Sequence, residues 1–180
     1  MFITCATIAQ SYLLLITSPM IGISGGTQAI LSYNYGARRA DRVKDAEKNI
    51  LGVMLIFTTI MFLLSRLVPR YFVLLFTSDP QYISFSVWAI HTYTLMIIPL
   101  SFQYVFVDGL TALDRPKTGL ALSVTRKSLF VLSAAILPVF FDAKAAFFAE
   151  PVADGVCSVL STVVFLLLIN RHLQKRCQTV

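Results

Sequence analysis

The sequence predicts an all-α, polytopic membrane protein with about five transmembrane helices, and three observations support this prediction. Hydrophobic residues make up 57% of the 180 residues, and the mean hydropathy is +0.76. Charged residues make up 13%, against about 25% in a typical soluble domain. Twelve of the fifteen Lys and Arg residues fall in three polar stretches that separate long apolar segments: Arg38–Lys48, Arg115–Lys127 and Arg171–Arg176.

The first two spans are predicted over Phe2–Ser32 and Asn49–Val68, because a helix needs about 20 mostly apolar residues to cross a bilayer. The first segment has no basic leader and is longer than the roughly 7–15 apolar residues of a signal peptide, so we expect a true span. A short apolar piece, Tyr71–Thr77, follows the second span and is expected to lie at the membrane surface.

Three further spans are predicted over Gln81–Val107, Thr118–Phe141 and Ala143–Asn170. Pro80 and Pro116 precede the third and fourth spans. Proline disfavours the helical conformation in the residue before it, so each of these prolines marks the end of one helix and the start of the next.

The basic stretches also predict the orientation, because Lys and Arg are retained on the cytoplasmic side. The N-terminus is then outside and the C-terminus inside a plasma membrane, with the lipid bilayer as the surrounding partner. This topology leaves three basic residues outside: Arg66, Arg70 and Lys144. Aromatic residues collect near the outer boundary, as in an aromatic belt: Tyr71, Phe72, Tyr82 and Trp88.

Small residues recur every four positions near the end of the first span, at Ser18, Gly22 and Gly26. On a helix they line one face and allow another backbone to approach closely. This stripe of small residues predicts a close contact with another helix. The contact either allows the two helices to move against each other or is ordinary static packing. Gln28, near the inner end, is a candidate for a hydrogen bond across helices or for a plain interfacial position.

Four prolines inside the predicted spans can remove a backbone donor and bend a helix. Membrane helices tolerate such bends where neighbours or water satisfy the freed carbonyl. These prolines are Pro19, Pro99, Pro138 and Pro151.

The fifth span contains two acids, in the run Glu150-Pro151-Val-Ala-Asp154. Asp154 lies about 16 Å in from Ala143 at 1.5 Å per residue, and a carboxylate at that depth costs about 2.5–3.5 kcal/mol on insertion scales. Such acids face a bundle interior or a wet cavity and mark ion or substrate paths. We therefore predict Asp154, and next Glu150, as path residues that exchange protons; the alternative is a carboxylate held by a neighbouring helix for folding alone.

Asp108 ends the third span, and Arg126 and Lys127 lie inside the fourth. Because a short turn joins these spans, an Asp108–Arg126 salt bridge could latch the cytoplasmic side. The interpretation that we favour is that both basic side chains snorkel to the interface and Asp108 is solvated. His91 is a lone histidine whose partner the sequence does not identify.

Several function classes lack their motifs. The chain has neither a Walker-type phosphate loop nor a G-x-S-x-G nucleophile elbow. We therefore expect that the protein is not an enzyme and binds no cofactor. His91 and His172 lack metal-ligand spacing, and the three cysteines lie far apart, so no metal site is expected. The basic residues lie in separate loops without interleaved aromatic residues, a pattern that argues against nucleic-acid binding.

The run from Pro19 to Ala37, PMIGISGGTQAILSYNYGA, followed by Asp41-Arg-Val-Lys44, resembles the multidrug and toxic compound extrusion (MATE) transporters. Later stretches are similar to the same family in the same order. They are Phe76-Thr-Ser-Asp79, Phe102-Gln103, Asp114-Arg-Pro-Lys117, Ser123-Val-Thr-Arg126 and Pro151-Val-Ala-Asp154.

The resemblance implies a family fold of twelve helices in two lobes, of which residues 1–176 would form helices eight to twelve and residues 177–180 a short cytoplasmic tail. It also implies efflux of cationic or lipophilic, drug-like compounds by antiport with Na⁺ or H⁺, together with a missing N-terminal lobe or a partner chain. Some members carry an acid midway along the helix that matches the third span. Here that region, Ile98–Gln103, has none, which leaves H⁺ coupling or coupling in the other lobe open.

Two other functions stay open at this point. The chain could be a truncated, non-transporting or structural membrane fragment. It could also be related to lipid-linked-oligosaccharide flippases, which share the two-lobe plan.

Overall fold

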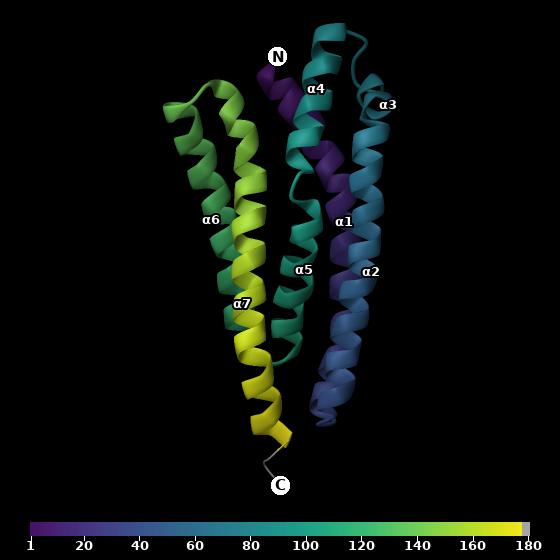
Figure 1. Cartoon of the computed structure of the whole chain (residues 1–180), viewed down its shortest axis with the longest axis vertical. Coiled ribbons are helices and arrows are strands. Elements are labelled where there is room, and N and C mark those ends of the chain that lie inside the picture. The colour runs from purple at the N-terminus through teal and green to yellow at the C-terminus, as the bar shows by residue number, and fades with distance from the viewer. Residues whose placement is uncertain (178–180) are drawn as a thin grey trace.

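The computed structural model describes residues 1–177 of the chain, and side chains as far as residue 169. Within these residues the chain is a bundle of helices without a strand, which confirms the predicted all-α class (Figure 1). Residues 178–180 of the predicted tail and the side chains of Arg171–Arg176 lie outside the described part. The helices are α1 (Phe2–Gly36), α2 (Ala40–Leu67), α3 (Pro69–Leu74), α4 (Pro80–Tyr93), α5 (Ile97–Ala112), α6 (Pro116–Phe140), the 3₁₀ helix η1 (Ala143–Phe148) and α7 (Ala149–Cys177).

The first two helices extend beyond the predicted spans, and α2 includes most of the first basic stretch. α1 continues to Gly36, and α2 begins at Ala40 rather than near Asn49. A tight turn joins them, with Arg38 at a positive φ of 58°. The apolar criterion marks only the part of a helix that crosses the bilayer, so it missed the polar beginning of α2, about two and a half turns long.

The predicted surface piece after the second span is α3, a short helix that begins at Pro69. Proline is well suited to the start of a helix because its missing N–H would be unpaired there. α4 begins in the same way: Pro80 follows Asp79, whose carboxylate Oδ1 accepts a hydrogen bond from the Gln81 N–H at 2.8 Å.

The third predicted span is a broken helix. α4 ends at Tyr93, α5 begins at Ile97, and the two axes differ by 46°. Pro99 explains the break, because proline has no N–H to donate and its ring clashes with the carbonyl four residues earlier, at Leu95. The Thr94 hydroxyl in the break donates to Ser65 on α2 at 3.1 Å.

The fifth predicted span begins as η1 and becomes α-helical only at Ala149. Pro151 therefore lies in the first turn of α7, where a missing N–H costs little. Pro19 and Pro138 lie within α1 and α6, which continue through them.

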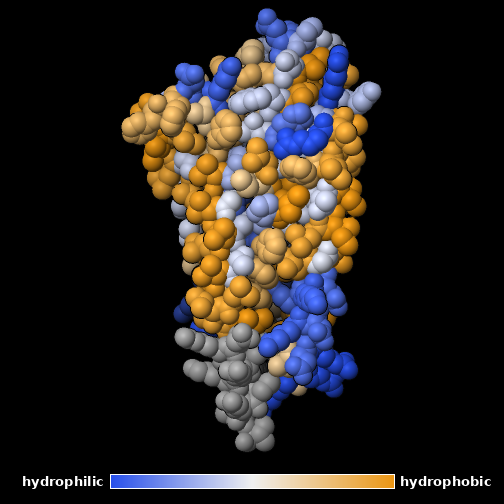
Figure 2. Space-filling view, viewed as in Figure 1, coloured by the Kyte–Doolittle hydropathy of each residue, from blue (hydrophilic) through white to orange (hydrophobic). Residues whose placement is uncertain are grey.

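Four helical segments are long and apolar enough to cross a membrane, and the bent α4–α5 pair makes a fifth. Apolar side chains cover the middle of the visible face, and hydrophilic ones gather toward its ends (Figure 2). The α1–α2 turn and the end of α7 lie at one end of the bundle, and the N-terminus lies at the other (Figure 1). The buried core is formed mainly by α1, α2, α4, α5 and α7.

Candidate functional site

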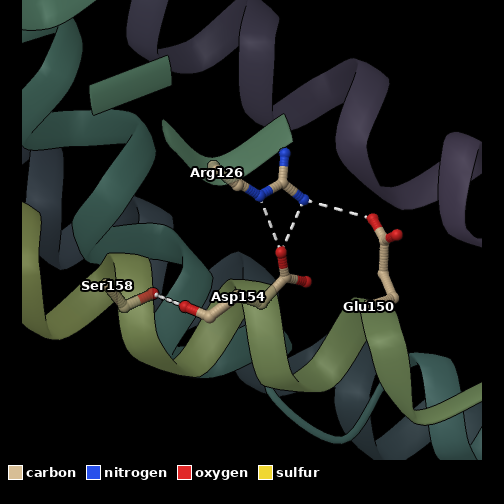
Figure 3. A network of polar contacts seen from close by, with 4 residues as sticks. All are labelled: Arg126, Glu150, Asp154 and Ser158. Atoms are coloured by element: carbon tan, nitrogen blue, oxygen red, sulfur yellow. Dashed lines mark hydrogen bonds and ion pairs between the residues drawn. The ribbon is translucent and has the colours of Figure 1, made fainter. Parts of the chain in front are cut away.

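The two acids of α7 lie on one face of the helix, because residues four apart are neighbours on a helical surface. Glu150 is in the first turn, and Asp154 is one turn further along. Both face α6, which packs against α7 along its length. From α6, Arg126 points between them (Figure 3).

Arg126 binds both carboxylates. Its Nε donates to Asp154 Oδ1 at 2.7 Å, and its Nη2 lies 2.6 Å from the same oxygen. The same Nη2 donates to Glu150 Oε1 at 3.3 Å. Arg126 is 8% exposed, Glu150 5% and Asp154 0%, so this group, here called the Arg126 triad, lies inside the protein.

The Arg126 triad has more negative charge than it can neutralise internally. One guanidinium faces two carboxylates, which leaves one negative charge when all three groups are ionised. Asp154 Oδ2 is buried without a hydrogen-bond partner. Because an unpaired charge in an apolar interior is costly, the triad has the chemistry to bind one cation, either a proton or a positively charged group.

Two neighbours complete the surroundings of the Arg126 triad. The Arg126 guanidinium carbon lies 5.9 Å from the centroid of the Tyr104 ring on α5, within range of a cation–π contact. The Ser158 hydroxyl donates to the backbone carbonyl of Asp154 at 2.5 Å (Figure 3). The Tyr104 contact links the triad to α5, whereas the Ser158 hydrogen bond stays within α7.

Neither sequence-based interpretation of Asp108 and Arg126 is correct. Arg126 does not snorkel, and it pairs with α7 rather than with Asp108. The reason is depth: Arg126 lies about 15 Å along α6 from Pro116, whereas Asp108 lies only about 6 Å from the end of α5. Asp108 is half-buried and accepts a hydrogen bond from Ser24 on α1 at 2.5 Å. Lys127 is exposed.

Asp108 and Arg126 nevertheless line one cavity, of about 250 Å³. Gln103 also lines it, and its Oε1 is buried without a partner. The cavity is lined by residues of α1, α5 and α6. Its remaining lining residues are Ile21, Tyr104, Val107, Ser123 and Lys127.

The small-residue stripe of α1 is not covered by another helix of the described chain. Ser18, Gly22 and Gly26 are all exposed, and a Cβ placed on either glycine would meet nothing within 4 Å. The close contact predicted for this stripe is therefore not made among the described residues. Gln28 is half-buried on the same helix.

Glu47 is a buried acid that is not among the site residues predicted from the sequence. It is 5% exposed, and its Oε1 has no hydrogen-bond partner. A signal was present in the sequence, because Glu47 shares the helical spacing of Val43, Ile50 and Met54, all buried. His91, the lone histidine, is half-buried with its Nε2 unpartnered.

Comparison with known proteins gives the family of this chain. The model of the MatE family matches residues 2–137. The chain belongs to the MatE family. Among characterised proteins, this MatE chain is similar to the FAD transporter of Shewanella oneidensis, with 26% identity over 133 residues. The match covers 74% of this chain and 29% of that protein.

The fold of this MatE chain is that of solved MATE transporters. It superposes on a crystal structure of a MATE protein in its bent conformation with a TM-score of 0.88 at 15% identity, covering 97% of this chain and 39% of the other. An inward-facing multidrug-resistance MATE family transporter gives a TM-score of 0.86 at 15% identity, with 96% and 40% covered. The chain thus spans less than half of the length of these relatives.

Proposed function

We propose that this MatE chain contributes the ion-binding lobe of a secondary transporter that exchanges Na⁺ or H⁺ for cationic or lipophilic compounds. The observation behind the proposal is the charge of the Arg126 triad, in which two buried carboxylates share one guanidinium. Intramembrane acids of this kind typically belong to ion or substrate paths. Family membership supports transport as the activity.

The proposed coupling follows from competition for one negative charge. When a proton or Na⁺ binds at Asp154, the Arg126 triad becomes neutral and no longer attracts a cationic solute. When the ion leaves, the charge returns and the solute binds better. A ligand shifts a conformational equilibrium only by its differential affinity for the two states, so exchange at this charge can drive alternating access.

A second candidate substrate is a dinucleotide such as FAD, because a relative with 26% identity is an FAD transporter. FAD carries a negative diphosphate, which the excess negative charge of the Arg126 triad would repel. The two candidates therefore make opposite electrostatic demands on the same lobe.

A counterflow experiment separates the candidates. Proteoliposomes containing the complete gene product are loaded with unlabelled solute, and uptake of a labelled cationic dye is compared with uptake of labelled FAD. We expect dye exchange and no FAD exchange. FAD exchange alone would replace the proposal by the second candidate, and exchange of neither would favour a non-transporting fragment or a flippase.

A further inference from the structure

Glu47 lies on the buried face of α2, near its cytoplasmic start in the predicted topology. Val43 and Met54 on the same face are fully buried, and Glu47 itself is 5% exposed. A carboxylate here is out of reach of bulk water. Its Oε1 is buried and accepts no hydrogen bond.

Gly109 on α5 provides the space for this carboxyl group. A Cβ on Gly109 would lie 3.0 Å from Glu47 Cδ and Oε2, and would collide with Oε1. The carboxyl group therefore presses directly on the backbone of α5. A side chain at position 109 would force the Glu47 carboxyl group to move, so the two residues form a direct contact between α2 and α5.

No ion pair among the side chains that the structure describes, which end at residue 169, includes Glu47. The ion pairs among the described residues are both made by Arg126. The charged group that faces Glu47 from α5 is Asp108, another acid, which is close enough to repel it. On α1, the hydroxyl of Ser24 donates a hydrogen bond to Asp108. On α7, the buried residues Phe165 and Ile169 are apolar.

Glu47 is buried, its Oε1 has no hydrogen-bond partner, and a second acid lies nearby. An ionised carboxylate in such surroundings is costly, so we expect it to bind a cation. A metal ion needs several oxygen or nitrogen ligands. Asp108 is the acid near Glu47, and Glu47 Oε1 has no hydrogen-bond partner among the described residues. A proton needs only the carboxylate itself.

We propose that Glu47 is a proton-binding site that holds α2 against α5 in the packed lobe. The bound proton makes the carboxyl group neutral and permits its direct contact with Gly109. Loss of the proton would place a charge against apolar backbone beside Asp108 and would separate the two helices. This site is distinct from the Arg126 triad and does not depend on the proposed transport function.

Infrared spectroscopy of the purified chain in lipid nanodiscs at neutral pH tests the proposal, because protonated and ionised carboxyl groups absorb at different frequencies. We expect the protonated-carboxyl band to lose the intensity of one group in Glu47→Gln. The matched control is Asp45→Asn on the same helix, whose exposed side chain should not contribute to the band. Asp154→Asn reports on the Arg126 triad separately, so failure of one proposal is distinguishable from failure of the other.

The same variants test the role in packing. Glu47→Gln keeps the shape and the neutrality of the protonated acid, so it should melt within about 2 °C of wild type, which corresponds to less than about 1 kcal/mol for a chain of this size. Glu47→Lys places a permanent charge in the contact and should unfold the lobe at lower temperature. A wild-type band unchanged in Glu47→Gln, or Glu47→Lys as stable as wild type, would overturn the proposal.

Discussion

Arg126 joins two helices of the bundle through charge rather than through apolar packing. Its guanidinium contacts Asp154 at 2.6 Å and Glu150 at 3.3 Å, with all three side chains buried. A buried ion pair adds little net stability, yet removal of one partner leaves an uncompensated charge. The triad is therefore a place where a single substitution has a large effect.

Arg126→Met should destabilise the protein by about 3–5 kcal/mol, because it leaves two buried carboxylates unpaired. Denaturant unfolding in detergent, followed by circular dichroism, measures the change. Lys127→Met is the matched control: the neighbouring residue is exposed, and its replacement should change stability by less than about 0.5 kcal/mol. Equal effects of the two substitutions would contradict the assignment of Arg126 to the triad.

The sequence was sufficient to select Asp154 and Glu150, because acids within an apolar span are costly and stand out. It could not identify their partner. From the sequence, Arg126 could equally have paired with Asp108. Only the depth of each residue along its helix decides which acid Arg126 contacts. Glu47 was hidden for a different reason: it lies in a polar stretch where acids are expected to face water.

At the scale of helices, the predicted spans correspond to the observed ones, and their ends differ where polar residues continue a helix or where proline interrupts it. α2 begins well before the apolar segment, and the third span is two helices. Hydropathy detects the bilayer-spanning part of a helix and is insensitive to its bend. The position of Pro99 would have located the break, since α5 begins two residues before it.

Pro99→Ala should allow α4 and α5 to approach a continuous helix. The 46° bend shortens the distance between Ser84 and Thr111 by roughly 3 Å relative to a straight helix, from the 1.5 Å rise per residue. Both positions are exposed and suit paired spin labels. Pulsed electron paramagnetic resonance should report the longer distance in Pro99→Ala, whereas Pro138→Ala on α6 should leave it unchanged. An unaltered distance in Pro99→Ala would mean that packing against α2 maintains the bend.

At the scale of the whole molecule, the ends of the bundle differ in their basic residues. The α1–α2 turn and the loop before η1 lie at opposite ends (Figure 1). The turn belongs to the first basic stretch, Arg38–Lys48, whereas the loop carries Lys144. The orientation that this asymmetry predicts can be measured directly.

Single cysteines at Ala37 and Asp142, both exposed, should react from opposite sides of the membrane. In a background with the three native cysteines replaced by serine, a membrane-impermeant maleimide added to intact cells should label position 142. Position 37 should react only after the membrane is opened. The reverse pattern would invert the predicted topology.

At the Arg126 triad, the proposed coupling ion and cationic solute compete for one negative charge. Asp154→Asn removes that charge and keeps an oxygen facing Arg126, so the protein should fold. Proteoliposomes containing the complete gene product, with a pH- or Na⁺-sensitive dye inside, report the ion flux caused by a cationic solute. We predict that this flux is lost in Asp154→Asn and kept in the exposed control Asp45→Asn; an Asp154→Asn protein that still couples ion to solute at the wild-type rate would contradict the claim.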